Sequence, residues 1–258
     1  GALTLIVICL INRVRLPPRH TWGPILVYAL LVTAIPWTAF AFAESHISSA
    51  LAGIINGTTP LMTLLAILIA FPEERPTRQR MLGLAIGFIG ILIVVGIWQG
   101  IGGSTLTGVI ACLLAVTCYG ISYPFARRYL TGGPHADDLA PLPLAAAVLI
   151  IGTIGTAPFA AVLGVVTGPL TWPIVLSMLA LGCLGSGIAY ILNLRIIALA
   201  DATTASTVTY IPPLIAVVIG ALFLGEHLTW NEPVGAVLVI AGAAIAQGII
   251  PARRRSPA

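Results

Sequence analysis

Long apolar stretches separated by short polar loops dominate this sequence. A helix that crosses a membrane needs roughly 20 apolar residues, and eight stretches are long enough. They cover residues 22–43, 47–71, 79–98, 106–126, 140–165, 173–198, 203–224 and 233–250. Residues 1–11 form a ninth, incomplete stretch, and none of these runs alternates polar with apolar residues as barrel strands do. The pattern predicts an all-α integral membrane protein.

One five-residue pattern occurs twice, and each residue of the second copy follows its counterpart by 152 positions, as 212 − 60 and 242 − 90 show. The first copy consists of Pro60, Glu74, Thr77, Gly83 and Gly90, and the second of Pro212, Glu226, Thr229, Gly235 and Gly242. Such a duplication indicates an internal structural repeat. Each unit contains an odd number of spans, so the two copies are predicted to be inverted relative to each other, an architecture typical of transporters.

The composition supports a membrane location and excludes several other classes. The chain of 258 residues is 59% hydrophobic and 8% charged, whereas soluble domains carry about 25% charged residues. The net charge of +4 does not indicate nucleic-acid binding, because the charges are spread over short loops and the C-terminal tail. The cysteines lie inside apolar runs without zinc or disulfide spacing. We therefore expect neither a metal nor a cofactor.

The arginines predict the orientation. All twelve cations are arginines, and threading the predicted spans through a membrane places every one of them on the same side. The opposite loops contain no arginine and lie near residues 44–46, 99–105, 166–171 and 225–232. By the positive-inside rule, the arginine-rich side and the C-terminus are cytoplasmic. We expect a multi-pass protein of a bacterial cytoplasmic (inner) membrane.

The repeat divides the chain into a first unit at residues 1–98, a second unit at 105–250 and a basic cytoplasmic tail at 251–258. The offset places residue 1 opposite Thr153, inside the second span of the second unit. We therefore expect the first unit to lack its first helix and half of its second, which leaves about nine spans of ten. A truncated sequence or a wrongly assigned start would explain this. A signal peptide is disfavoured, because no basic segment precedes residues 1–11.

Two stretches resemble the EamA module of the drug/metabolite transporter superfamily. They are SSALAGIINGTTPLMTLLAILIAFPEE with GLAIGFIG, and ATTASTVTYIPPLIAVVIGALFLGE with GAVLVIAG. The resemblance covers nearly the whole chain and implies ten helices in two inverted five-helix halves around a central substrate cavity. It also implies transport of amino acids and other small metabolites, mostly as export. The first copy departs from the family pattern, because Pro72 and Glu73 stand where the second copy has Leu224 and Gly225.

The repeated prolines are candidates for a functional role. Pro60 and Pro212, the latter followed by Pro213, lie inside apolar stretches, and a proline in a helix interior removes one backbone hydrogen bond. A membrane tolerates the freed carbonyl only where protein or water meets it. We interpret these prolines as kinks that act as gates beside a substrate path, with a bend due to packing alone as the alternative.

The other repeated residues favour structural roles. Glu74 and Glu226 end their spans, where a helix-end anchor is favoured over a proton-coupling carboxylate, since a coupling acid belongs near the midplane. The repeated glycines form small-residue faces that allow helices to approach closely. The two helices that carry them, at 79–98 and 233–250, are expected to pack on equivalent partners or on each other.

Polar and aromatic side chains recur at helical spacing within five of the apolar stretches. Interhelical hydrogen bonds would explain some of these stripes, and the functional interpretation is a substrate cavity. The predicted substrate-binding residues are Trp37, Asn56, Thr59, Tyr119, Tyr123, Tyr190, Asn193, Thr207 and Tyr210. Because no Lys or Arg reaches the middle of a span, such a lining suits neutral or zwitterionic solutes.

These patterns predict a secondary transporter that moves small neutral or zwitterionic metabolites, such as amino acids or related compounds, by alternating access, with export as the expected direction. Its partners would be the solute and the lipid bilayer, without nucleic acid, and it would be a monomer or, alternatively, a homodimer. An enzyme is disfavoured because the sequence has no GxSxG motif and no His/Asp/Glu cluster. The alternatives are a non-transporting scaffold, an inactive fragment and an exporter of drug-like or cationic compounds.

Overall fold

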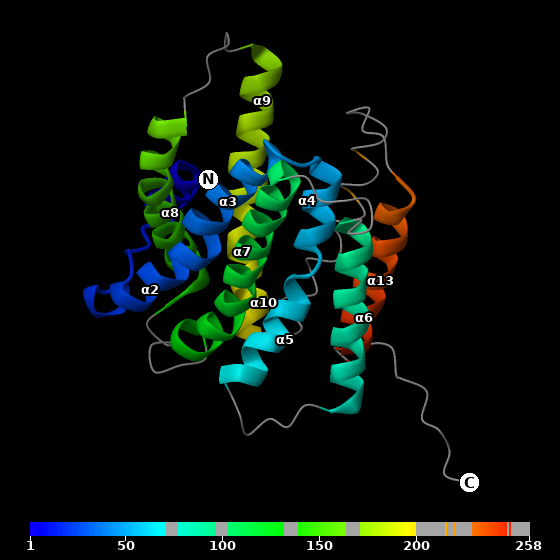
Figure 1. Cartoon of the computed structure of the whole chain (residues 1–258). Coiled ribbons are helices and arrows are strands. Elements are labelled where there is room, and N and C mark those ends of the chain that lie inside the picture. Colours follow the sequence, from blue (N-terminus) through cyan, green and yellow to red (C-terminus); the bar gives the residue numbers. More distant parts are fainter. Residues whose placement is uncertain are drawn as a thin grey trace. The chain divides into compact units, whose positions relative to one another are not determined.

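The computed structural model describes residues 1–70, 77–95, 103–131, 139–163, 171–199 and 229–246, together with residues 215, 219 and 248. All regular secondary structure in these ranges is helical, as predicted (Figure 1). The α-helices are α1 (Ala2–Ile11), α2 (Trp22–Ala29), α3 (Ile35–Glu44), α4 (Ser49–Asn56), α5 (Thr59–Ala70), α6 (Arg78–Val95), α7 (Gly103–Ala126), α8 (Pro141–Leu163), α9 (Trp172–Ala180), α10 (Ala189–Leu199) and α13 (Asn231–Ala246). The π-helical segments are η2 (Leu30–Ala34), η4 (Arg127–Thr131) and η6 (Leu181–Ile188), and η1 (Arg19–Thr21) is a 3-10 turn.

Six helical segments in the described part of the chain are long and apolar enough to cross a membrane. They are Arg19–Glu44, Ser49–Ile69, Arg78–Val95, Thr105–Thr131, Pro141–Ala161 and Trp172–Leu199. The shorter apolar helices α1 and α13 correspond to the incomplete first stretch and to the last predicted span. The predicted span at 203–224 lies outside the described residues. The chain is a multi-pass helical membrane protein.

The span predicted at 47–71 consists of two helices, α4 and α5, separated by a turn at residues 57–58. Pro60 therefore lies in the first turn of α5, which corrects the interpretation of a kink inside one continuous helix. Pro60 has no N–H for the Asn56 carbonyl four residues earlier, and the Thr59 hydroxyl donates to that carbonyl at 2.7 Å instead. The helix is thus interrupted within the span, while a carbonyl at the interruption keeps a hydrogen-bond donor.

Two π-helical segments occupy corresponding positions in the two repeats, a feature that the sequence pattern did not indicate. Residues 30–34 correspond to residues 182–186 under the 152-residue offset, and η6 covers that second range. π-Helical turns are rare and are found frequently at functional sites. Their matched placement extends the internal symmetry from the sequence to the backbone geometry.

The helices pack into two compact units. The first unit consists of residues 1–38 and 125–205, and the second of residues 39–124 and 206–258. Each unit contains helices from both sequence repeats, since α1 and α2 contact α8 in the first and α6 contacts α13 in the second. The packing units therefore differ from the sequence repeats, because helices that correspond by the offset pair with each other inside one unit.

The first unit contains close contacts between small side chains. The Thr4 hydroxyl of α1 donates to Cys183 Sγ of η6 at 3.2 Å. A methyl group on Gly152 of α8 would lie 2.8 Å from the Thr33 Cβ of η2. Such contacts let helix backbones approach each other in a membrane, where close packing and interhelical hydrogen bonds drive association.

In the second unit, α6 and α13 run side by side in backbone contact (Figure 1). A methyl group on Gly90 would lie 2.7 Å from the Val239 nitrogen and 3.0 Å from the Gly235 oxygen. One on Gly242 would lie 2.7 Å from the Gly83 oxygen. The contact of Gly90 with Gly235 and that of Gly242 with Gly83 are equivalent under the repeat offset. Of the two arrangements expected from the sequence, the repeated glycines therefore pack on each other, about an internal twofold axis.

Two amide side chains at corresponding positions connect the ends of this helix pair. Asn231 Nδ2, at the start of α13, donates to the Val94 carbonyl near the end of α6 at 2.9 Å. Gln79 Nε2, at the start of α6, donates to the Ile245 carbonyl near the end of α13 at 3.1 Å. Positions 79 and 231 differ by the repeat offset. Each amide thus adds a hydrogen bond between the two helices, at opposite ends of the pair.

Asn231→Ala is expected to lower the free energy of unfolding by about 0.5–1.5 kcal/mol, because Asn231 is buried and its loss removes the hydrogen bond to the Val94 carbonyl. Gln79→Ala should cost about 1 kcal/mol or less, since Gln79 is half-buried and water can replace its amide. Denaturant unfolding of the purified protein in detergent measures both. An Asn231→Ala protein as stable as the wild type would show that the amide contributes nothing to the pairing.

The repeated threonines lie at the starts of the same two helices. The Thr77 hydroxyl accepts the Arg80 N–H at 3.2 Å, which is the hydrogen bond of a helix N-cap. The Thr229 N–H donates to the Glu232 carboxylate at 2.9 Å, the reciprocal half of a capping box. These two residues of the repeated pattern therefore have structural roles.

Candidate functional site

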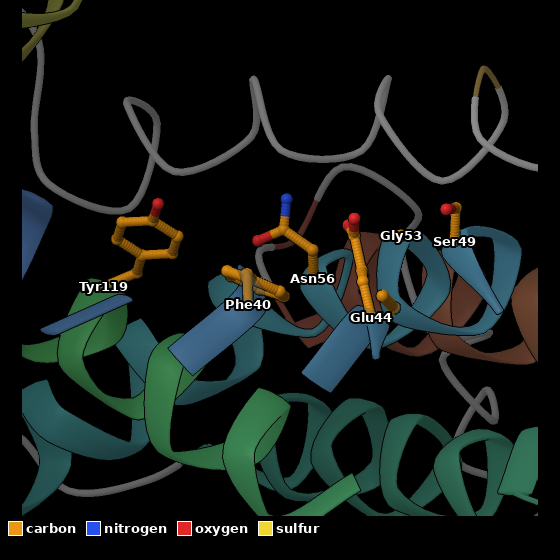
Figure 2. A pocket seen from close by; sticks show the side chains of 7 residues that line it. Phe40, Glu44, Ser49, Gly53, Asn56 and Tyr119 are labelled. Atoms are coloured by element: carbon orange, nitrogen blue, oxygen red, sulfur yellow. The ribbon is translucent and has the colours of Figure 1, made fainter. Parts of the chain in front are cut away.

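A cavity of about 290 Å³ lies in the second unit between α3, α4 and α7. Its lining residues are Phe40, Glu44, Ser49, Ala52, Gly53, Asn56 and Tyr119. Figure 2 shows the Glu44, Asn56 and Tyr119 side chains projecting to the same side of these helices. The volume is close to the lower end of the range for small-molecule sites, roughly 300–1,000 Å³.

One face of α4 supplies most of this lining. Ser49, Gly53 and Asn56 recur at i, i+4 and i+7, which places them on the same side of a helix. Ser48 fixes the start of α4 as an N-cap whose hydroxyl accepts the Leu51 N–H at 3.2 Å. At its other end α4 stops at Asn56, before the turn that separates it from α5. The interruption therefore places a polar helix end beside the cavity.

Two aromatic rings form the apolar part of the lining. The Phe40 and Tyr119 rings are stacked, with centroids 6.1 Å apart and planes inclined by 29°. Both side chains are half-buried. The pair presents a broad apolar surface against which an aromatic or aliphatic group of a solute can lie.

The polar part of the lining carries a single formal charge among the residues that the structure describes. Among the seven lining residues only Glu44 is charged, and its side chain is exposed. Ser49, Asn56 and Tyr119 add neutral donors and acceptors of hydrogen bonds. The site can therefore attract a positive group, hydrogen-bond a carbonyl or carboxylate, and accommodate an apolar side chain.

The structure places two of the predicted substrate-binding residues, Asn56 and Tyr119, in the lining of one cavity. Thr59 and Tyr123 lie near them in sequence but are buried and are not part of that lining. The Thr59 hydroxyl donates to the Asn56 carbonyl and lies 3.4 Å from the Asn56 Oδ1. Thr59 therefore orients the end of α4, and binding of a solute by any of these side chains stays a prediction.

Trp37 and Tyr190 meet in the first unit. Their rings pack edge to face, with centroids 6.0 Å apart and planes at 88°. The Tyr190 hydroxyl donates to the Val32 carbonyl at 2.8 Å, and Asn193 is half-buried on α10 of the same unit. Pro36 lacks the N–H that would otherwise reach Val32 four residues earlier. Tyr190 therefore supplies a donor at the point where the π-helical segment η2 passes into α3.

Tyr190→Phe is expected to lower the free energy of unfolding by about 1–2 kcal/mol, because it leaves the Val32 carbonyl without the hydroxyl donor. The loss should be smaller in a Pro36→Ala background, which restores a backbone N–H at position 36. A double-mutant cycle of unfolding free energies in detergent measures this coupling. Strictly additive effects would show that the hydroxyl does not substitute for the missing N–H.

The remaining predicted site residues lie outside the described residues. They are Thr207, Tyr210, Pro212, Pro213, Glu74 and Glu226. Their predicted roles as cavity lining, gates and helix-end anchors stay predictions.

Five lining residues, Phe40, Glu44, Ser49, Ala52 and Gly53, were not predicted from the sequence. The arginine distribution placed Glu44 in a loop predicted to face outward, although Glu44 is the last residue of α3. Phe40 and Glu44 are four residues apart, which places them on one helical face. That spacing, read together with the Ser49 to Asn56 face of α4, was the available signal.

Among the residues that the structure describes, no group of three or more His, Cys, Asp or Glu side chains could hold a metal ion. Apolar helical spans, an internal repeat and a mixed polar and aromatic cavity beside an interrupted helix are features of secondary transporters. Comparison with known protein families shows to which family of transporters the chain belongs. The chain matches the EamA-like transporter family over residues 1–96 and 106–247 and belongs to it.

Two similar proteins are described as uncharacterized transporters. The uncharacterized transporter YdfC of Bacillus subtilis (strain 168) is 24% identical over 244 residues, which cover 94% of this chain and 76% of that protein. An uncharacterized transporter of Clostridium kluyveri is 25% identical over 230 residues, which cover 86% of this chain and 71% of that protein. The family and these names indicate a transporter and not an enzyme.

A solved crystal structure shares the fold. It aligns with a TM-score of 0.68 at 18% sequence identity and covers 97% of this chain and 85% of that chain. Likeness at this level of identity concerns the fold alone.

Proposed function

We propose that this protein is a secondary transporter that exports small neutral or zwitterionic metabolites, amino acids or related compounds, across the bacterial cytoplasmic membrane by alternating access. The observation that carries the proposal is the cavity between α3, α4 and α7. Its size suits a single small solute, and its neutral hydrogen-bonding groups and stacked rings suit a molecule with both polar and apolar parts.

Two backbone features support alternating access. Transporters with internal repeats bind their solutes near interrupted helices, because the interruption frees backbone groups and creates a place where half-helices move. The α4–α5 interruption lies beside the cavity. The paired π-helical segments η2 and η6 supply local departures from α-helical geometry at matching positions of the two repeats.

The arginine distribution supports the proposed orientation. All arginines fall on one side of the threaded spans, which the positive-inside rule assigns to the cytoplasm. The C-terminus would then be cytoplasmic, and Glu44 and Ser49 would lie toward the outer end of their spans.

A second candidate function is export of cationic compounds. The Glu44 carboxylate in the cavity lining favours it, because a carboxylate attracts cations and repels anions. Both candidates share the same cavity and differ in whether the solute also carries a carboxylate.

Counterflow into proteoliposomes tests the transport activity, because exchange between preloaded and labelled solute needs no knowledge of a coupling ion. Vesicles preloaded with a single neutral amino acid are diluted into the same labelled amino acid, and a panel of amino acids is measured in turn. We expect labelled solute to accumulate for at least one member of the panel. Vesicles without protein serve as the control.

Accumulation of no neutral, zwitterionic or cationic solute by folded, reconstituted protein would overturn the transport proposal. Direction is tested separately in native membranes. Inverted vesicles should accumulate the solute if the protein exports it, and accumulation confined to right-side-out vesicles would reverse that part of the proposal.

A further inference from the structure

We propose that one end of the first unit binds the headgroup of an anionic phospholipid. The binding surface consists of the connection between α1 and α2 at residues 12–21, the segment η4 and the C-terminal part of α10. We call it the arginine surface, because it contains every arginine of the first unit: Arg13, Arg15, Arg19, Arg127, Arg128 and Arg195. The partner is a lipid of the surrounding membrane and does not depend on which solute is carried.

Three segments of the chain meet at this surface. Trp22 Nε1 donates to the Pro17 carbonyl at 3.0 Å, which holds the α1–α2 connection against the start of α2. The segment η4 contacts both α2 and α10. Arg127 Nη1 donates to the Ile197 and Ala198 carbonyls at 3.2 and 2.8 Å, which ties η4 to the end of α10. Arginines from distant parts of the sequence therefore lie at one end of the unit.

The positive charge of the first unit exceeds what its own acidic residues can neutralise. The unit contains six arginines and three aspartates, which gives a formal charge of +3. The aspartates lie outside the described residues and are Asp137, Asp138 and Asp201. The second unit contains six arginines and five glutamates, which gives +1. Even with every aspartate of the first unit paired to an arginine, a net positive charge would remain to attract anionic headgroups.

Arg13 has a backbone conformation that favours glycine. Its φ is 52°, in the left-handed region, where a residue with a Cβ is sterically disfavoured. The turn follows α1 directly and is closed by the Val14 N–H, which donates to the Cys9 carbonyl at 2.9 Å. Glycine is the usual residue at this position after a helix. An arginine in its place is costly for the backbone and indicates that the side chain has the role.

Aromatic residues place the arginine surface at the depth of lipid headgroups. Trp22 begins α2 and is half-buried, and Tyr129 in η4 is exposed. Trp and Tyr are enriched at membrane–water interfaces, where their rings lie at the level of the headgroups. The Arg128 Cζ lies 5.5 Å from the centroid of the Tyr129 ring. All six arginines are exposed, so lipid phosphates at this depth can reach them.

The chemistry of arginine suits a lipid phosphate. A guanidinium group is planar, stays charged at any physiological pH and binds two phosphate oxygens with parallel N–H groups. Arg127 is oriented by the carbonyls at the end of α10, where the helix dipole also favours a cation. A headgroup with a net negative charge would be attracted, whereas a zwitterionic headgroup brings a cation of its own that the arginines repel. The surface therefore selects anionic over zwitterionic phospholipids.

Thermal unfolding of the purified full chain in a neutral detergent tests this selection. The probes are phosphatidylglycerol, phosphatidylcholine with the same acyl chains, and glycerol 3-phosphate. Phosphatidylglycerol should raise the melting temperature, because a ligand of the folded state stabilises it, and the titration midpoint gives its apparent affinity. Phosphatidylcholine should bind at least about fivefold more weakly. Glycerol 3-phosphate should have no effect at equal concentration, since it has no acyl chains to hold it at the protein–detergent boundary.

Two double variants of equal charge and spacing locate the binding. Arg13→Gln/Arg15→Gln removes two charges from the arginine surface and should weaken phosphatidylglycerol binding about tenfold, with phosphatidylcholine unaffected. Arg78→Gln/Arg80→Gln makes the same change at the start of α6 in the second unit. It should alter the affinity less than about twofold.

Arg15→Gln/Arg19→Gln is a second test of the surface that leaves the turn at Arg13 unchanged. It should weaken phosphatidylglycerol binding about as much as the first variant, and circular dichroism verifies that every variant is folded. Equal losses in the first-unit and second-unit variants, or equal binding of the two phospholipids by the wild type, would overturn the proposal. A rise in melting temperature with glycerol 3-phosphate as large as that with the lipid would assign the surface to a soluble phosphate and contradict the lipid.

Failure of this proposal and failure of the transport proposal have different signatures. Phosphatidylglycerol binding that depends on Arg13 and Arg15, in protein that shows no counterflow, would support the lipid surface and contradict transport alone. Counterflow by protein without any preference for phosphatidylglycerol would support transport and contradict the lipid surface.

Discussion

Gly242→Leu is expected to yield no folded protein, and Gly242→Ala to lower the free energy of unfolding by about 2–3 kcal/mol. The cause is the backbone contact between α13 and α6. A methyl group on Gly242 would lie 2.7 Å from both the Gly83 oxygen and the Gly87 Cα. These are backbone atoms, so no side-chain rotation can relieve the overlap, and the two helices must separate.

Separation would also break the two amide hydrogen bonds at the ends of the pair. Asn231 reaches the Val94 carbonyl and Gln79 reaches the Ile245 carbonyl only while the helices stay close. In the membrane, where neighbouring helices are held by packing and by such bonds, both contributions would be lost together. The effect of one added side chain should therefore exceed that of removing a single hydrogen bond.

Gly23→Leu is the matched control, because a Cβ added at Gly23 would have no atom within 4 Å beyond its chain neighbours and its own helix backbone. Fluorescence-detected size exclusion and thermal unfolding in detergent distinguish the variants. Gly90→Ala should behave like Gly242→Ala, since Gly90 is its counterpart in the repeat and would meet the Val239 nitrogen at 2.7 Å. A monodisperse Gly242→Leu protein with the wild-type melting temperature would contradict the contact.

The sequence predicted the helices of this fold well but not how they pair. Apolar stretches of sufficient length determine spans directly, because the bilayer requires every backbone group to be satisfied within a helix. The repeat offset identified Gly83, Gly90, Gly235 and Gly242 as equivalent positions. Equivalence alone allows the two glycine faces to pack on separate partners or on each other, and only the three-dimensional contacts decide between these.

Local backbone geometry was predicted in part. Pro60 correctly predicted where the helical geometry is disturbed, but a proline in an apolar stretch is compatible with both a kink and an interruption. The outcome depends on whether the freed Asn56 carbonyl finds another donor, and here the Thr59 hydroxyl provides one. The π-helical segments η2 and η6 were not predicted, because they are insertions in hydrogen-bond register that leave the hydrophobic pattern almost unchanged.

The residues that line the cavity could also be predicted only in part from the sequence. Asn56 and Tyr119 were selected because polar side chains are costly in lipid, which makes them conspicuous within apolar stretches. Phe40 is apolar and so indistinguishable from its neighbours in the sequence. Glu44 ends a span, where charges are ordinary. Their shared surface exists only because α3, α4 and α7 converge, and no periodicity within one helix contains that information.

Tyr119→Ala is expected to reduce counterflow at least about tenfold, the effect of losing roughly 1.4 kcal/mol of interaction with the moving solute. The change removes the ring that is stacked on Phe40, which is one of the two aromatic rings in the described lining of the cavity. Tyr119→Phe keeps that surface and should retain transport within about threefold. Initial rates are normalised to the amount of reconstituted protein.

Tyr129→Ala controls for the loss of a tyrosine ring elsewhere. Tyr129 is exposed, contacts Phe125 with ring centroids 4.8 Å apart, and is not part of the cavity lining. It should transport at the wild-type rate. Folded Tyr119→Ala protein that also transports at the wild-type rate would place the solute path away from α3, α4 and α7.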